Sequence, residues 1–460
     1  EQQLNNAINY GDAFAQAELK KKVADAMDKV AFTYKTFKWL QINQSDNMPA
    51  YKEAKKELKE RLASLNEVLN RHLYRSTSNQ PYEEWLRNTQ PFHWIAEFYD
   101  IIKGKQGFDV IIGNPPYVVY TDSKFSYKIN DYQTQSCANL YAFCIERSEI
   151  IHNKNGKFGM IVPNSSISAD KMSSLQKIII NKKNCWITNY SWRPSKLFEG
   201  ADMLLAIILT SKSKRQNTFS SIYHKWYNEY RPYLFCYIEY VNVTNILIDG
   251  SIPKTPSPII YEIFSKMKRT SRNTLCSSNF SPSPTKYFLY YFRAVQYWFK
   301  VLDQIPTYTE NNENKVTGEM KTIYVFSNRE KYALIAFLSS SCFFLNYITW
   351  SSCQVVNNRD FNVYFDLRNN NSNIVQQLSD LGIKLQNNYQ KFSKLRVRNY
   401  SKKGRMFTMS KQHFYIKLSK PIIDEIDKVL AKHYGFTEEE LDFIINYDIK
   451  YRMGDELNEE

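Results

Sequence analysis

Four consecutive residues, Asn114, Pro115, Pro116 and Tyr117, place a side-chain amide, two rigid rings and an aromatic ring directly after the apolar run 108–112. The Asn114 amide oxygen and the Pro115 backbone carbonyl are two hydrogen-bond acceptors at adjacent positions. Pro116 stiffens the turn, and Tyr117 offers a face on which a flat ring can stack. The alternative interpretation is an ordinary turn after a strand, because Asn and Pro are common turn residues.

The residues around this motif alternate between short apolar strands and helices. We predict strands at 108–112, 156–165 (ending at Pro163), 186–192 and 203–210, and helices at 139–151 and 173–180. Such a pattern is typical of a mainly parallel sheet with helices on both faces. Ligands bind beyond the carboxyl ends of parallel strands. Both Asn114–Tyr117 and Pro163–Ser165 fall at that edge.

Different patterns flank this central region. The first hundred residues are charged and helical in pattern. Residues 51–74 carry leucines at helical spacing, which we interpret as a packing stripe rather than a partner site: Leu58, Leu62, Leu65, Leu69 and Leu73. After about Lys212, aromatic stretches alternate with polar loops, which indicates a separate mixed domain. Near the end, Pro421 and Gly435 delimit a helix, and Thr437 with Glu440 forms the capping box of a last helix.

The segment from Lys391 to Arg405 has seven basic residues and no acidic one. It is either a solvated loop or a segment that lies along phosphate groups. Its basic residues are Lys391, Lys394, Arg396, Arg398, Lys402, Lys403 and Arg405. We predict four regions: a helical region at 1–100, the motif-bearing region at 101–212, the mixed domain at 213–405 and a C-terminal helical segment at 406–460.

Composition narrows the class of protein. The chain has 460 residues, enough for two or three domains. Its 61 Lys and Arg exceed its 46 Asp and Glu, for a formal net charge of +15, and 15% of residues are aromatic. This balance suits a polyanion with flat bases better than an acidic metabolite.

The seven Cys and six His show no metal-ligand spacing, so we predict no metal site and a reducing compartment. No apolar run reaches the ~18 residues of a membrane span and no signal peptide is visible, so we expect no membrane partner and a cytoplasmic location.

The Asn-Pro-Pro-Tyr tetrapeptide after a buried strand resembles motif IV of the amino-group methyltransferases that use S-adenosylmethionine. The stretches YEEWLRNTQPFHWIAEFYDII before it, GKFGMIVPNS and SWRPSKLFEG after it, and GFTEEELDFIINYDIKYR near the end look like one group. That group is the γ-type, large adenine-N6 DNA methyltransferases of type IIG restriction-modification and related phage-defence (PglX-like) systems. The resemblance implies an α/β fold with a partial Rossmann-like class I methyltransferase sheet and a mixed α/β target-recognition domain at 213–405. It also implies double-stranded DNA as partner and S-adenosylmethionine as cofactor.

The resemblance gives the motif residues roles in methyl transfer. A target base must leave the duplex to reach such a site. Asn114 and Pro115 would accept the hydrogens of the adenine amine, which favours a pyramidal nitrogen with a localised lone pair in line with the sulfonium methyl. Tyr117 would stack on one face of the flipped base. The resemblance assigns the other face to Phe198, for which ordinary core packing is the alternative.

The cofactor half of the family pattern is not recognisable. The family binds its cofactor through a glycine-rich loop upstream of motif IV, but only Gly11, Gly104 and Gly107 precede Gly113 here. Asp12 is a candidate contact for the adenine of the cofactor, or else a helix N-cap. The sheet would then lack its first strands and leave apolar edges uncovered. We therefore expect the cofactor half, and any nuclease, to come from upstream sequence or from another chain.

Two other interpretations stay open. One is a DNA-binding specificity module that has lost catalysis, which the missing glycine loop favours and the intact tetrapeptide disfavours. The other is a protein-glutamine methyltransferase. Those enzymes also carry this tetrapeptide, but they are typically compact and lack a recognition domain.

Overall fold

The structure is a computed structural model that describes residues 13–43, 47–77, 80–121, 123–125, 129–181, 183–199, 202–247, 250–254, 257–295, 297–368, 372–402 and 405–454. The chain divides into two compact units, and each is described by itself. Unit 1 comprises Glu1–Val162, Lys177–Cys185 and Ile208–Gln216. Unit 2 comprises Pro163–Gln176, Trp186–Ile207 and Asn217–Glu460.

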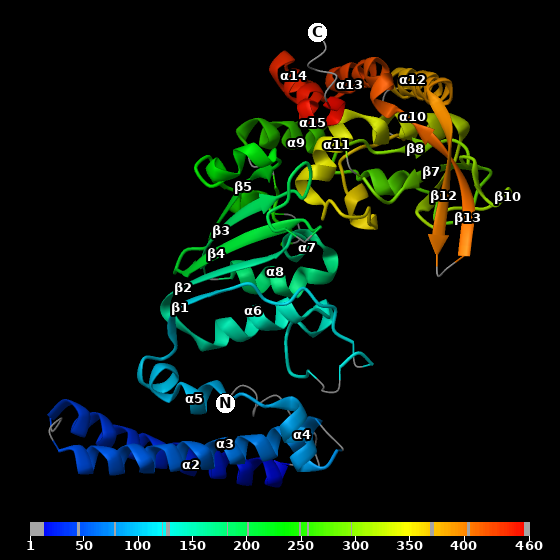
Figure 1. The fold of residues 1–460 in the computed structure, drawn as a ribbon. Coiled ribbons are helices and arrows are strands. Elements are labelled where there is room, and N and C mark those ends of the chain that lie inside the picture. Colours follow the sequence, from blue (N-terminus) through cyan, green and yellow to red (C-terminus); the bar gives the residue numbers. More distant parts are fainter. Residues whose placement is uncertain are drawn as a thin grey trace. The chain divides into compact units, whose positions relative to one another are not determined.

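Two long helices of unit 1, α2 (Ala13–Asn43) and α3 (Met48–Thr77), lie side by side (Figure 1). Val30 of α2 and Leu58 and Leu65 of α3 are buried in their common core, and Leu62 and Leu69 pack against it. The leucine stripe therefore packs α3 against α2, as predicted. Three short helices follow: α4 (Tyr82–Thr89), α5 (Trp94–Glu97) and the π-helical turn η1 (Asp100–Gly104).

Six strands form one sheet in the order β1-β2-β4-β3-β5-β6. Their bounds are β1 (Phe108–Gly113), β2 (His152–Pro163), β3 (Lys183–Tyr190), β4 (Leu205–Lys212), β5 (Asn217–His224) and β6 (Val241–Asn242). β1 and β2 pair in parallel, whereas β5 and β6 pair antiparallel. The four predicted strands are confirmed, and the two predicted helices are α6 (Leu140–Ile151) and α8 (Ser173–Ile180).

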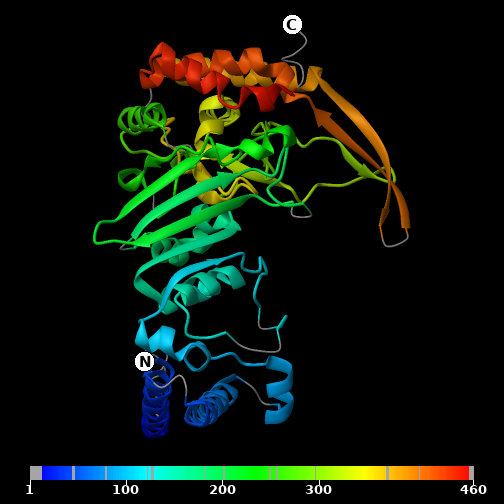
Figure 2. The same cartoon turned by 60° about the vertical axis from the view of Figure 1, so that its left-hand side comes forward.

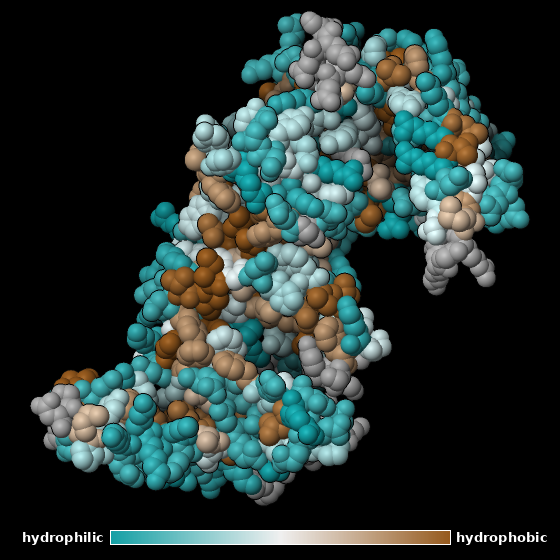
Figure 3. Space-filling model, viewed as in Figure 1, coloured by the Kyte–Doolittle hydropathy of each residue, from teal (hydrophilic) through white to brown (hydrophobic). Residues whose placement is uncertain are grey.

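One face of the sheet is exposed at β1, which is an edge strand. Val110 and Ile112 share a face because side chains alternate along a strand, and they are 62% and 82% exposed. Gly159 of β2 stands beside Ile112, and a Cβ on it would lie 3.1 Å from Leu209 of β4. Hydrophobic side chains gather at the surface over the β1–β2 part of the sheet (Figure 3). The predicted cover on both faces is missing at β1 within the described ranges. The exposed apolar side chains agree with the other expectation, that the sheet leaves apolar edges uncovered.

Unit 2 contains a three-stranded antiparallel sheet in the order β11-β7-β8. The strands are β7 (Tyr287–Phe292), β8 (Val301–Leu302) and β11 (Met320–Val325). The helices of this unit are α7 (Ser165–Ser168), α9 (Pro258–Thr270), α10 (Asn328–Ser339), α11 (Ser341–Trp350), α12 (Ser372–Lys391), α13 (Lys420–Tyr434), α14 (Glu438–Asn446) and α15 (Ile449–Met453). Phe337, Phe343 and Phe365 lie fully buried in one large core. The mixture of helices and sheets predicted after about Lys212 is confirmed, whereas the predicted domain boundary at Lys212 stays a prediction.

A long hairpin of β12 (Ser393–Lys402) and β13 (Arg405–Phe414) belongs to a second sheet of unit 2. This sheet has the order β10-β9-β13-β12, with β9 (Tyr308–Glu310) and β10 (Glu313–Asn314). Figure 2 shows the hairpin as a ribbon that projects from the helices of its own unit. The basic segment is thus mainly a strand, not a loop. The boundary predicted between residues 405 and 406 falls inside the hairpin, whose two strands pair along their whole length.

The predicted C-terminal helices are confirmed with their end signals. α13 ends at Gly435, which adopts the left-handed conformation with φ 69°. Thr437 and Glu440 form a reciprocal capping box at the start of α14. Both signals are local, so the sequence alone identifies them.

No single described helix is long and apolar enough to cross a membrane. α10 and α11 satisfy the length and composition test only together, and they bend by 61° at their junction.

Candidate active site

The tetrapeptide lies at the carboxyl end of β1, which ends at Gly113. Because β2 runs parallel to β1, both strands point to the same edge of the sheet. The Asn114 side chain is exposed, and no described residue makes a hydrogen bond to its amide. Pro115 is buried and Pro116 is exposed. The carboxamide is therefore open to a ligand, while the next residue is held in the protein.

Tyr117 anchors the motif to the neighbouring strand. Its hydroxyl donates a hydrogen bond of 3.0 Å to the backbone carbonyl of Ile161 on β2. Burial raises the pKa of the Tyr117 phenol to about 12, so the hydroxyl stays protonated and keeps donating at neutral pH. The ring is partly exposed. The hydrogen bond thus fixes one end of the ring beside Asn114, an effect that the sequence did not predict.

Phe198 lies in unit 2, in the segment that follows β3. Two backbone carbonyls just before it, those of Lys196 and Leu197, accept hydrogen bonds of 3.0 and 2.7 Å from the Arg231 guanidinium. Lys196 also forms a 2.8 Å ion pair with Asp202 on the other side of Phe198. The Phe198 ring itself is partly buried. Its backbone is therefore well held, and its role in stacking on a base stays a prediction.

A polar residue at the end of β2 was not singled out from the sequence. The Asn164 side chain is fully buried, and neither its amide oxygen nor its nitrogen has a hydrogen-bond partner among the described residues. Its backbone N–H donates to the Leu204 carbonyl at 2.9 Å. Asn164 could have been recognised from the sequence, because it is a polar residue directly after a predicted strand. The stretch 163–165 was already predicted to lie at the carboxyl edge of the sheet.

The two described glycines upstream of β1 do not form the glycine-rich loop expected for S-adenosylmethionine. Gly107 has φ +122°, and a Cβ on it would lie 2.6 Å from the Ile151 carbonyl oxygen, so it allows two backbone segments to approach closely. A Cβ on Gly104 would lie 2.7 Å from an Asp100 carboxylate oxygen within one helical turn. Both glycines serve local packing, and neither opens a loop that could hold the cofactor. Asp12, the other candidate contact, lies outside the described residues.

The basic segment presents most of its candidate DNA-contact residues to solvent. Lys391 ends α12, and Lys394, Arg396 and Arg398 lie along β12; all four side chains are exposed. Arg396 donates a 2.7 Å hydrogen bond to the Tyr415 hydroxyl. Lys403 lies outside the described residues, and the side chains of Lys402 and Arg405 are not described either.

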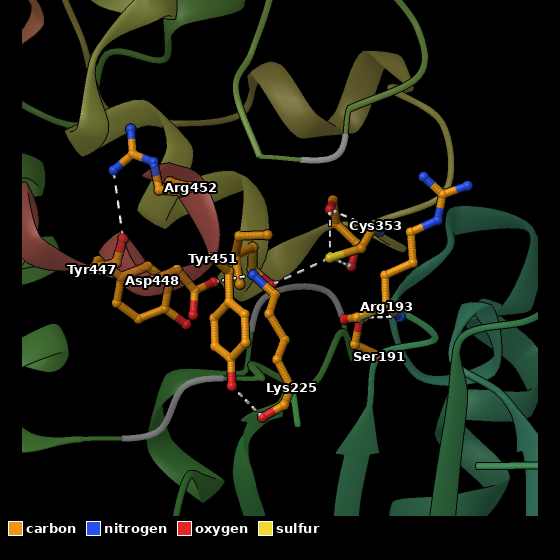
Figure 4. A network of polar contacts seen from close by, with 10 residues as sticks. Ser191, Arg193, Lys225, Cys353, Tyr447, Asp448, Tyr451 and Arg452 are labelled. Atoms are coloured by element: carbon orange, nitrogen blue, oxygen red, sulfur yellow. Dashed lines mark hydrogen bonds and ion pairs between the residues drawn. The ribbon is translucent and has the colours of Figure 1, made fainter. Parts of the chain in front are cut away.

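A buried network in unit 2 ties the C-terminal residues to the end of β5 (Figure 4). Lys225, directly after β5, forms an ion pair with Asp448, and the Tyr451 hydroxyl donates to the Lys225 carbonyl at 2.7 Å. A cavity of about 40 Å³ beside it is lined in part by Arg193, Lys225 and Cys353. That volume holds roughly a few water molecules. We interpret the network as structural, because the charges of Lys225 and Asp448 neutralise each other in the ion pair.

Within the described ranges, no group of three or more His, Cys, Asp or Glu side chains could hold a metal ion.

Part of the chain is similar to known proteins. Residues 19–198 match the family model described as Eco57I restriction-modification methylase, and this range includes both Asn114 and Phe198. A protein of Methanocaldococcus jannaschii, named "Putative type II restriction enzyme and methyltransferase RM.MjaORFECS2P", is 29% identical over 282 residues. The alignment covers 56% of this chain and 23% of that protein. The chain thus spans less than a quarter of the length of the curated relative it matches.

Similar solved structures are more distant. The type IIL restriction-modification enzyme MmeI in complex with DNA is 11% identical, with a TM-score of 0.39, over 80% of this chain and 57% of that chain. The DrdV–DNA complex is 9% identical, with a TM-score of 0.37, over 76% of this chain and 57% of that chain. These values are too low to transfer any structural detail.

Proposed function

We propose that this chain is the base-binding and DNA-reading part of a site-specific adenine-N6 DNA methyltransferase in a restriction-modification or related defence system. The observation that carries the proposal is the placement of Asn114. Its carboxamide is exposed and has no hydrogen-bond partner among the described residues. Asn114 follows directly after β1 and precedes Tyr117, whose hydroxyl is hydrogen-bonded to β2. The match of residues 19–198 to a methylase family supports the same assignment. We also propose that this enzyme is a γ-type methyltransferase of the type IIG group.

In the proposed mechanism, the residues of the motif position the target amine. The Asn114 amide oxygen and the Pro115 carbonyl accept its two hydrogens, which favours a localised lone pair on the nitrogen. The Tyr117 ring stacks on one face of the flipped adenine and Phe198 on the other. Neither an amide nor a backbone carbonyl can remove a proton near neutral pH, so these groups orient the amine and do not act as bases.

The proposed methyl donor is S-adenosylmethionine, bound by residues outside the described part of unit 1 or by another chain. Two observations support this division. Gly104 and Gly107 serve local packing, and β1 is an edge strand with exposed Val110 and Ile112. Parallel sheets are normally covered on both faces, so a further strand and its helices would bury these side chains.

The test of the proposal is the substitution Asn114→Ala in the assembled enzyme. N6-adenine methylation of duplex DNA, read by mass spectrometry, should be abolished, while duplex affinity stays nearly unchanged. The matched control is Asn155→Ala, because Asn155 is also exposed and lies on β2. Loss of methylation and of DNA binding together in Asn114→Ala would contradict the catalytic assignment.

Three measurements test the cofactor site and separate the other interpretations. Calorimetric titration of this chain with S-adenosylmethionine would reveal a cofactor site upstream of Phe108 if heat is released. Absence of methylation in every reconstituted assembly, with duplex binding intact, would instead favour the inactive specificity module, as the lack of a recognisable cofactor loop does. A methyl group found on a protein glutamine rather than on DNA would favour the glutamine methyltransferase.

A further inference from the structure

The two faces of the β12–β13 hairpin differ in chemistry. Residues directly opposite each other in an antiparallel pair project to the same face. The pairing Lys394–His413, Arg396–Lys411 and Arg398–Met409 therefore places five basic side chains together. We call Lys394, Arg396, Arg398, Lys411 and His413 the basic face. The opposite face carries uncharged residues, among them Leu395, Val397, Asn399 and Thr408.

The basic face is positive along its length. Residues 391–414 contain eight Lys or Arg and no Asp or Glu. Strand pairing brings two carboxylates beside this face. Glu310 of β9 is paired with Met409 and accepts a hydrogen bond from Tyr308. Glu313 of β10 is paired with Glu310 and forms an ion pair with Lys315. Burial and then the charges of Arg396, Lys300 and Lys411 lower the pKa of His413, as expected in a positive potential. A polyanion would neutralise this concentration of charge.

The far part of the hairpin is a free two-stranded ribbon. β13 pairs with β9 at residues 409–411, and within the described ranges no third strand joins the pairs from Tyr400–Phe407 to Lys402–Arg405. The Tyr400 and Phe407 rings stack with centroids 5.7 Å apart, and the Thr408 hydroxyl donates to Asn399 at 2.9 Å. Two strands alone are marginally stable in water, so these cross-strand contacts are needed to keep the ribbon extended.

The shape and charge of this ribbon fit one partner. The major groove of B-DNA is about 12 Å wide and admits a two-stranded ribbon, and its walls are phosphates. We propose that the β12–β13 hairpin enters the major groove of duplex DNA with its basic face toward the DNA. Lys394 and Lys411 contact phosphates, and Arg398 contacts guanine. This inference rests on the proposed function and names the element and the groove through which the duplex is bound.

Arg398 is assigned to the base for a structural reason. Arg396 donates to the Tyr415 hydroxyl and lies over the Tyr415 ring at 5.5 Å, so its guanidinium is already engaged. Arg398 is exposed and has no partner among the described residues. A free guanidinium can donate two parallel hydrogen bonds to guanine O6 and N7, both of which lie in the major groove.

The experiment measures duplex binding by the full chain as a function of salt, with a pool of random duplexes as probe. Each lost phosphate contact lowers the slope of log K against log salt by about 0.9, so Lys394→Gln/Lys411→Gln should lower it by about 1.8. The matched control is Lys428→Gln/Lys432→Gln on α13, which removes the same charge from exposed side chains off the hairpin. The control should keep the wild-type slope. Thermal unfolding of each variant confirms that it is folded.

A second readout identifies the groove. Dimethyl sulfate modifies guanine N7 in the major groove and adenine N3 in the minor groove. On a duplex selected from the pool, the wild type should protect guanine N7, and Arg398→Gln should lose protection of at least one guanine while the other variants keep it. The inference would be overturned by equal salt slopes for the wild type and Lys394→Gln/Lys411→Gln, or by protection confined to adenine N3. In either case, duplex binding by the wild type would still support DNA as the proposed partner. Failure of the wild type to bind duplex even at low salt would overturn the proposed function as well.

Discussion

The hydrogen bond from Tyr117 to Ile161 makes a quantitative prediction about how the motif is held. Tyr117→Phe keeps the ring and removes the hydroxyl, which donates to the Ile161 carbonyl at 3.0 Å. A hydrogen bond of this kind contributes about 0.5–1.5 kcal/mol net. Tyr117→Ala also removes the ring, which is only partly buried and therefore contributes less than the roughly 1.5–3 kcal/mol of a fully buried aromatic side chain. We therefore expect Tyr117→Phe to cost about 0.5–1.5 kcal/mol of local stability and Tyr117→Ala to cost more, up to about 4.5 kcal/mol.

The assay is hydrogen–deuterium exchange of peptides that contain residues 158–163 of β2. A loss of about 0.5–1.5 kcal/mol corresponds to exchange roughly 2- to 12-fold faster in Tyr117→Phe, because about 1.4 kcal/mol is a factor of ten. The pH dependence follows from the raised pKa of Tyr117, about 12. A group with a raised folded-state pKa contributes stability that is complete below its ordinary pKa and is lost as pH rises through the folded value. The difference between wild type and Tyr117→Phe should thus stay constant from pH 6 to 9.

Two results would refute this reasoning. Unchanged exchange of β2 in Tyr117→Phe would mean that water replaces the phenol at Ile161 without cost. Equal acceleration in Tyr117→Phe and Tyr117→Ala would mean that the ring contributes no packing to the motif. As an internal control, peptides from α2 should exchange at the wild-type rate in both variants.

Three further predictions concern unit 2. Phe198→Ala should weaken binding to DNA with a mismatched target base by ~1–3 kcal/mol if Phe198 stacks on the base, and an unchanged affinity in fluorescence titration would contradict that role. Gly382→Ala should lower the thermal midpoint, because a Cβ there would lie 2.1 Å from the Tyr332 carbonyl oxygen and overpacking costs about 1–3 kcal/mol. A raised midpoint would show that helix propensity outweighs the clash. Lys225→Met should cost up to about 3–5 kcal/mol in urea unfolding, since it leaves the mostly buried Asp448 carboxylate without its partner. Additional removal of the carboxylate in Lys225→Met/Asp448→Leu should recover part of that loss, and no recovery would count against the pairing.

Local patterns account for the parts of the fold that the sequence predicted. The apolar run at 108–112, the stop at Pro163 and the leucine spacing of α3 each report burial along one element. The capping box of α14 depends on residues three positions apart. The tetrapeptide could be located for the same reason, because its position follows directly from the strand before it.

The sequence by itself thus determined the central strands and helices, the position of Asn114–Tyr117 at a strand end, and the excess of positive charge. The tertiary structure alone decided what these elements pack against. It showed that the Tyr117 hydroxyl is bound to a carbonyl 44 residues away, that the basic segment is half of a hairpin with one charged face, and that Ile112 is exposed rather than covered. The physical reason is that strand pairing, side-chain anchoring and face coverage join residues distant in the chain, whereas propensity and periodicity report only on neighbours.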